Sequence, residues 1–241
     1  MKMEIKNQQS LSAAHTLPIS ENSIPGTKEK FWTRLRMFML ALLLIGLTGQ
    51  GCDDDDDIDP LNSDAYIGLN QDMRNLWSEH MAWTLATVEA FFHHNNALTD
   101  NLNRLLQNQE DIGAAIVPYY GQVAGDQLTE LLTEHINLAV PVLTAAQNGD
   151  ETALGIAVTN WKNNAQDIAE FLTAANPNHW PASVTEPTME EHIDQTIDYS
   201  VKILENNHAA ANVAYDHALA HMMTLADILS EGIAKQFPDK F

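Results

Sequence analysis

The spacing of apolar residues most strongly constrains what this chain can fold into. After residue 63 they recur three and four positions apart along almost the whole chain. This spacing gathers apolar side chains on one face of an α-helix, and the strict alternation typical of half-buried β-strands is absent. The pattern therefore predicts an all-α protein.

Breaker residues divide the region after residue 63 into six predicted helices. These cover residues 70–95, 97–119, 122–147, 151–175, 188–207 and 209–236, and a proline-rich loop is expected at 176–187. We expect Asp150 to cap the fourth helix, and Thr188 with Glu191 to form a capping box at the start of the fifth. Pro141 should kink the third helix. Short links make sequence neighbours antiparallel, so the predicted fold is an antiparallel six-helix bundle.

Two short motifs each occur three times with similar spacing. The first, Glu-His followed by an apolar residue, contains His80, His135 and His192, which are 55 and 57 residues apart. The second, an Asp-Ile pair, contains Asp111, Asp167 and Asp227, which are 56 and 60 residues apart. The histidines fall on odd-numbered predicted helices and the aspartates on even-numbered ones. We therefore predict three αα-hairpin repeats of about 56 residues each.

Similar heights in the hairpins would bring these three histidines and three aspartates into one polar layer across the bundle. Neutral imidazole and carboxylate groups suit a transition metal such as Zn, Fe, Mn or Cu, held between facing helices. The alternative is a buried His–Asp hydrogen-bond network that only stabilises the bundle. His217 and His221, four residues apart on the last predicted helix, form a second, weaker candidate pair.

Charge is divided unevenly along the chain. From residue 52 onward there are 6 Lys and Arg residues against 30 Asp and Glu residues, a balance of −24. So acidic a surface repels nucleic acids, and we expect no nucleic-acid partner. Metal ions, basic proteins and polar small molecules fit this charge, although acidic residues also serve solubility alone.

The N-terminal part of the chain has the pattern of an export signal. Basic residues precede an apolar run at 37–47, which is too short to span a bilayer, and Gly51 precedes the only cysteine, Cys52. This resembles a bacterial lipoprotein signal, which implies lipidation of Cys52 and a membrane anchor in the cell envelope, with the protein periplasmic or surface-exposed. The predicted organisation is a signal segment at 1–51, a lipidated acidic tether at 52–63 containing five consecutive aspartates, and one helical domain at 64–241.

Enzyme motifs are absent from the sequence. It contains no G-x-S-x-G elbow, no P-loop, no G-x-G-x-x-G and no H-E-x-x-H motif. A His–Asp pair could act as a general base, but no nucleophile is evident beside it. We therefore expect a binding protein rather than an enzyme. The alternative is a structural or partner-binding surface lipoprotein with no ligand.

Several stretches together resemble a family of poorly characterised bacterial exported helical proteins. The matching pieces are LLQNQEDIG at 105–113, PYYG at 118–121, LLTEHI at 131–136, ANP at 175–177 and QFPDKF at 236–241. The resemblance implies a helical bundle over most of residues 70–241. It implies no particular activity.

Overall fold

The computed structural model of the protein describes residues 59–93 and 96–241. The predicted signal segment, Cys52 and the aspartate run at 53–57 lie outside these residues. Within them the chain forms six long α-helices and no strand, which confirms the predicted all-α class. The helices are α2 (Asp64–Phe92), α3 (Leu98–Tyr120), α4 (Gln122–Asn148), α5 (Glu151–Ala175), α6 (Ala182–Leu204) and α7 (His208–Gln236), with short 3-10 helices η1 (Pro60–Asn62) and η2 (Pro238–Lys240) at the two ends.

The junction between α4 and α5 is formed as the sequence predicts. Gly149 follows α4 with a φ of 65°, a left-handed conformation that glycine adopts without a steric penalty. Asp150 is the N-cap of α5, and its side chain accepts a hydrogen bond from the backbone N–H of Ala153. The predicted cap is confirmed.

The start of α6 differs from the prediction. The helix begins at Ala182 rather than Thr188, and Pro187 lies inside it. Pro187 is the sixth residue of α6, where a proline removes one backbone hydrogen bond and crowds the carbonyl group four residues earlier, a local cost that did not end the helix. The predicted capping box is wrong, because the Thr188 hydroxyl donates to the carbonyl oxygen of Val184, one turn back. The expected loop therefore shortens to residues 176–181.

The first helix begins earlier than the sequence pattern indicated. Ser63 caps α2 by accepting a hydrogen bond from the backbone N–H of Tyr66. Residues 60–62, placed by the sequence in the acidic tether, form η1, which packs against α2 and α7. The folded part of the chain thus extends at least to this turn.

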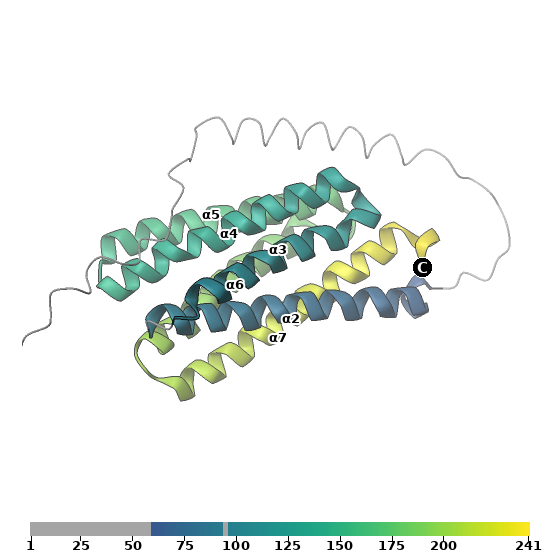
Figure 1. Cartoon of the computed structure of the whole chain (residues 1–241). Helices are drawn as coiled ribbons and strands as arrows, with labels where there is room; N and C mark the ends of the chain where they lie inside the picture. Colours follow the sequence, from purple (N-terminus) through teal and green to yellow (C-terminus); the bar gives the residue numbers. More distant parts are fainter. Residues whose placement is uncertain (1–58, 94–95) are drawn as a thin grey trace, which may run out of the picture. The chain divides into compact units, whose positions relative to one another are not determined.

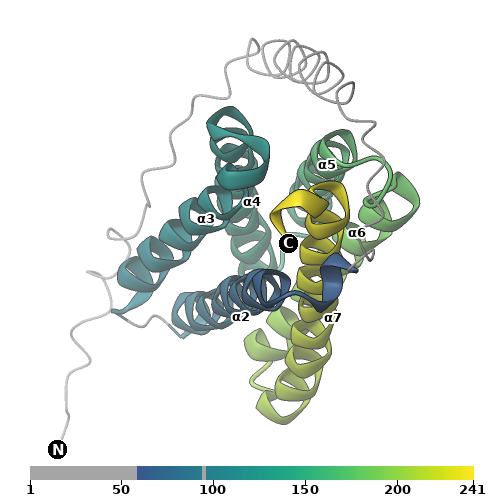
Figure 2. The same cartoon turned by 90° about the vertical axis from the view of Figure 1, so that its right-hand side faces the viewer.

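Each long helix packs against the helices before and after it in the chain, and α2 also packs against α7. These contacts join the six helices into a closed bundle, in which α2 and α7 cross in contact (Figure 1) and α3 lies beside α4 (Figure 2). The packing of α3 on α4 is as extensive as the packing within the predicted hairpins, so the contacts do not by themselves separate three repeats.

Trp180, in the loop before α6, packs closely against α7. Its indole is buried, and its Nε1–H donates to the carbonyl oxygen of Ile228 at 3.1 Å. A Cβ added at Gly232 would lie 2.0 Å from the Nε1 atom of Trp180. This position therefore requires a glycine, which lets the loop close over one end of the bundle.

No helix in the described part of the chain is both long enough and apolar enough to cross a membrane.

Candidate histidine site

Three histidines from alternating helices meet in the interior of the bundle. His80 on α2, His135 on α4 and His192 on α6 have exposed fractions of only 2%, 2% and 3%. The ring centroid of His192 lies 5.7 Å from that of His80 and 5.6 Å from that of His135. The predicted convergence of the three histidines is confirmed, and His192 contacts both of the others. We call these three residues the histidine cluster.

The predicted aspartate partners occupy other places. Asp227 accepts two hydrogen bonds from Arg74, at 2.7 and 2.8 Å, and its side chain is 46% exposed. Asp111 lies 3.7 Å from Arg104 and its side chain is 41% exposed. Asp167 is also only partly buried on α5. The predicted pairing with the histidines is wrong for Asp111 and Asp227, whose carboxylates contact arginines instead. Burial of a carboxylate in an apolar core costs free energy, so these side chains stay near water and a cation.

His135 is instead held by an asparagine. The distance from His135 Nδ1 to Asn164 Oδ1 is 2.9 Å. The amide nitrogen of Asn164 donates to the carbonyl oxygen of Leu131, at 3.2 Å, and this orients the amide oxygen toward the ring. The Nδ1–H of His135 therefore donates to Asn164, and the lone pair of the neutral ring lies on Nε2.

His80 has a comparable amide neighbour. The Nε2 atom of Gln109 lies 3.3 Å from His80 Nδ1, and it also lies within reach of the Leu105 carbonyl oxygen at 2.7 Å and of Asn108 Oδ1 at 3.2 Å. Two amide hydrogens cannot satisfy three acceptors equally, so the longest contact, to His80, is the weakest. His80 is therefore less firmly oriented than His135.

Two fully buried ring nitrogens of the cluster have no hydrogen-bond partner among the described residues. They are Nε2 of His135 and Nδ1 of His192, and both are buried. A buried polar atom without a partner costs about 1–3 kcal/mol. Such atoms therefore mark a place where a water molecule, an ion or another ligand would be stabilised.

Burial also fixes the charge of the cluster. It lowers the pKa of His80 to about 3 and the pKa of His135 to about 4. The pKa of His192 falls well below its ordinary value through burial and the proximity of His135 and His80. All three imidazoles are consequently neutral near pH 7, the form in which histidine binds metals.

The three histidines line one small pocket with a free volume of about 40 Å³. Thr196 and Trp161 border it with them, and most of the remaining wall is apolar, from α2, α3 and α4. A typical ligand site is an apolar pocket into which a few polar groups with strongly shifted pKa values point.

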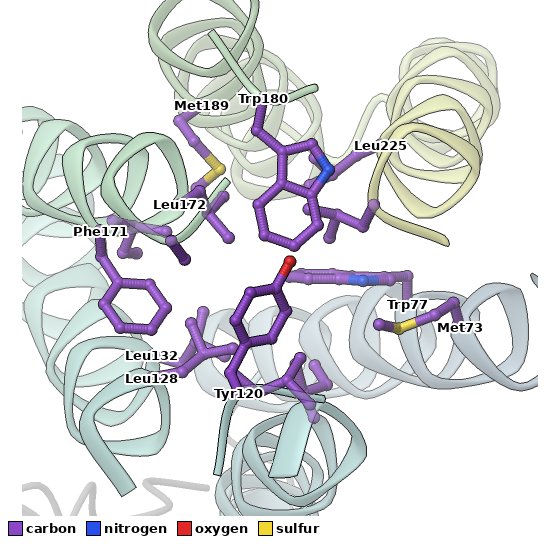
Figure 3. A pocket seen from close by; sticks show the side chains of 15 residues that line it. Met73, Trp77, Tyr120, Leu128, Leu132, Phe171, Leu172, Trp180, Met189 and Leu225 are labelled. Carbon is purple, nitrogen blue, oxygen red and sulfur yellow. The ribbon is translucent and has the colours of Figure 1, made fainter. Parts of the chain in front are cut away.

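A second pocket lies beside the first and is almost wholly apolar. Figure 3 shows the side chains of Trp77, Tyr120 and Trp180 around it. Its free volume is about 20 Å³. The ring of Trp77 also lies 5.6 Å from that of His80, so this indole separates the two pockets. The polar chemistry is thus concentrated at the histidine cluster.

As the side chains stand, no group of three or more His, Cys, Asp or Glu residues within 59–93 and 96–241 has the arrangement of a metal site. Coordination by the histidine cluster therefore requires its rings to turn until their nitrogens face one point. Of the other candidates, His217 is exposed, and the side chain of His221 is mostly buried against α6.

Sequence reasoning found the three histidines but missed part of their surroundings. Gln109, Trp161 and Thr196 were not singled out, because single polar or aromatic residues on a helix carry no motif. Asn164 carried a signal, since it lies three residues before the repeated aspartate.

The chain matches no family model, no curated protein and no solved structure.

Proposed function

We propose that this chain is a lipid-anchored, extracytoplasmic binding protein that holds a transition-metal ion at His80, His135 and His192. One observation carries the proposal: three buried, neutral imidazoles share one small pocket, and two of their fully buried ring nitrogens lack a hydrogen-bond partner among residues 59–93 and 96–241. Neutral imidazole is the commonest metal ligand among side chains.

The spacing of the rings fits a shared ion. With Zn–N bonds of about 2.0–2.1 Å, two imidazoles on one tetrahedral ion have ring centroids about 5 Å apart. The centroid distances in the cluster are 5.6 and 5.7 Å. Both ring pairs that include His192 are therefore close to the spacing that a shared ion requires.

The hydrogen bond from His135 to Asn164 prepares one ligand in advance. It places the proton on Nδ1 and leaves the Nε2 lone pair free, and Nε2 is one of the two unpartnered nitrogens. An oriented imidazole of this kind is a common feature of metal sites, where a second group fixes the tautomer.

The size of the pocket favours an ion over an organic molecule. Its free volume is about 40 Å³. A cavity that admits benzene measures about 150 Å³, and a cavity needs about 10–15 Å³ to hold one water molecule. An ion with one water molecule fits the available space. Three nitrogen ligands without a carboxylate favour Zn or Cu over Mn, which prefers oxygen.

A second candidate function has its own support. Asn164 and Gln109 already act as hydrogen-bond partners of two cluster histidines, and ordered water could satisfy the remaining nitrogens. In this alternative the cluster only stabilises the bundle, and the chain is a structural or partner-binding surface lipoprotein. Its acidic surface would then suit a basic protein partner.

The three-hairpin repeat is part of the proposal, and one register supports it. His80 and Gln109 are 29 residues apart, as are His135 and Asn164. The residue 29 positions after His192 is His221, whose proximity contributes to the lowered pKa of His192. Each histidine thus has a polar neighbour at the same offset in its hairpin. We also propose, from the sequence pieces given above, that the chain is related to exported bacterial helical proteins.

The membrane anchor is proposed from the sequence alone. Cys52, lipidated, would hold the chain in the cell envelope, and the aspartate run would space the bundle from the membrane. Replacement of Cys52 by serine should move the protein from the membrane fraction to the soluble fraction. Retention in the membrane fraction would refute the anchor.

Metal binding is tested on protein purified without affinity histidines. Plasma mass spectrometry should find one tightly held metal ion per chain after dialysis against Zn²⁺ or Cu²⁺. His135→Ala should lose that ion, and the matched control His217→Ala, an exposed histidine, should keep it. Failure of the unaltered protein to hold any metal ion would favour the structural alternative.

A further inference from the structure

His221 on α7 lies against α6 with its two nitrogens facing two different oxygens. Its Nε2 is 2.9 Å from the carbonyl oxygen of Thr188, and its Nδ1 is 3.7 Å from Glu191 Oε2. A carbonyl oxygen only accepts hydrogen bonds, so Nε2 carries the hydrogen. The Nδ1 atom then faces a carboxylate oxygen of Glu191, and a proton or a metal ion between these two atoms would bind both of them.

Such a pair is stabilised when a positive charge lies between its members. The other carboxylate oxygen of Glu191 accepts a hydrogen bond from the amide of Gln195 at 2.8 Å, which orients the carboxylate. A zinc ion bound at about 2.0–2.2 Å to a nitrogen and an oxygen holds those two atoms about 3.4 Å apart. The observed 3.7 Å is close to that value.

These groups also lie in order of increasing burial. The side chain of Glu191 is 58% exposed and that of His221 is 15% exposed, whereas His192 as a residue is 3% exposed. Glu191 directly precedes His192 on α6, and His221 contacts Glu191 from α7. From the acidic surface to the core, the ligand types change from carboxylate to imidazole. An acidic surface also raises the local concentration of cations.

We propose that Glu191 and His221 form an outer cation-binding step through which a divalent metal ion passes between solvent and the histidine cluster. This inference rests on the proposed function, because it assigns a route to the same metal ion. The outer pair supplies two ligands and water supplies the others, so the ion is held weakly there and moves on to the three imidazoles.

The experiment separates the rate of metal uptake from the affinity. Zinc chloride is mixed in a stopped-flow instrument with protein and a chromophoric zinc chelator, and equilibrium competition with the same chelator gives the affinity. His221→Gln keeps a donor for Thr188 but removes the imidazole lone pair. Glu191→Gln removes the charge but keeps an oxygen for Gln195. His217→Ala is the control, since it removes an exposed histidine one turn away on α7.

His221→Gln and Glu191→Gln should each slow zinc uptake by about tenfold or more, the scale of electrostatic effects on association rates. Their equilibrium affinity should stay within about twofold of the unaltered protein. Uptake as fast as in the unaltered protein, or equal slowing in His217→Ala, would overturn the outer step alone. Absence of equilibrium zinc binding in the unaltered protein would overturn the proposed function and the outer step together.

Discussion

His135 and Asn164 are joined by a hydrogen bond of 2.9 Å inside the bundle, between helices α4 and α5. The same amide also donates to the carbonyl oxygen of Leu131, so Asn164 contacts both the ring and the backbone of α4. This pair fixes the tautomer of the histidine and leaves one ring nitrogen facing no partner among the described residues.

Removal of the Asn164 side chain should therefore destabilise the protein. Asn164→Ala leaves the buried Nδ1–H of His135 without an acceptor, and we expect the free energy of unfolding in urea to fall by about 1–3 kcal/mol. Asn163→Ala is the matched control, because Asn163 is exposed on the same helix and should change stability by less than about 0.5 kcal/mol. Equal effects of the two substitutions would show that the buried hydrogen bond contributes nothing.

The double variant His135→Leu with Asn164→Leu tests the same bond in another way. Replacement of both partners removes the unsatisfied groups, so the loss of stability should be smaller than the sum of the two single losses. Urea unfolding of all four proteins gives the coupling between the residues. Strict additivity would mean that the two side chains act independently.

The histidine cluster should make the protein sensitive to acid. Folding lowers the pKa of His80 to about 3 and that of His135 to about 4, and it also lowers the pKa of His192. In the unfolded chain these groups have a pKa of about 6.5. Their contribution to stability is therefore complete above pH 6.5 and is lost as the pH falls toward the folded pKa values, since the unfolded state takes up the protons first.

With three such groups, the free energy of unfolding should fall by up to about 4 kcal/mol per pH unit well below pH 6. Urea titrations between pH 7.5 and 4.5, in the presence of a metal chelator, measure this slope. His192→Gln should reduce the slope by about one third. Equal stability at pH 7 and pH 5 would contradict the burial of neutral histidines.

The sequence predicted the histidine cluster because helical spacing places His80, His135 and His192 on apolar faces of alternating helices. It did not predict which polar residue approaches each ring. Asn164 and Asp167 are three residues apart, about 60° around the helix and about 4.5 Å along it, so either could have faced His135. The carboxylate remains partly exposed and the neutral amide is buried, a difference that depends on the cost of desolvating a charge.

Local signals located some helix ends better than others. Asp150 was predicted correctly because a side-chain cap is decided within one turn. The start of α6 was predicted wrongly because Pro187 was taken as the end of a loop, whereas six residues of helix precede Thr188. In this first part of α6, Thr185 shares a hydrogen bond of 2.7 Å with Thr173 on α5, a tertiary contact that has no local sequence signal.

Gly232 should be among the glycines least tolerant of substitution. A Cβ there would lie 2.0 Å from the indole nitrogen of Trp180, so Gly232→Ala should force the loop away and lower stability by about 1–3 kcal/mol. Gly155, exposed on α5 with no atom within 4 Å of an added Cβ, is the control. Gly155→Ala should raise stability by about 0.5–1 kcal/mol. Thermal unfolding of both variants measures the contrast, and a stabilising Gly232→Ala would refute the close contact.

The aspartates of the repeated motif should not affect metal affinity. Asp227 pairs with Arg74 in a partly exposed position, so Asp227→Asn should cost at most about 1 kcal/mol of stability. Its zinc affinity, measured by calorimetry, should equal that of the unaltered protein within about twofold. Even outer partners of metal ligands typically change affinity 10–100-fold when they are replaced. A loss of zinc affinity of about 10–100-fold in Asp227→Asn or Asp111→Asn would show that these aspartates contribute to the metal site.

X-ray absorption at the zinc edge tests the central proposal most directly. For protein carrying one zinc ion per chain, three imidazole nitrogens are expected at about 2.0–2.1 Å, and His135→Ala should not retain the ion that gives this spectrum. A spectrum with only oxygen neighbours, or one that His135→Ala leaves unchanged, would contradict metal binding by His80, His135 and His192.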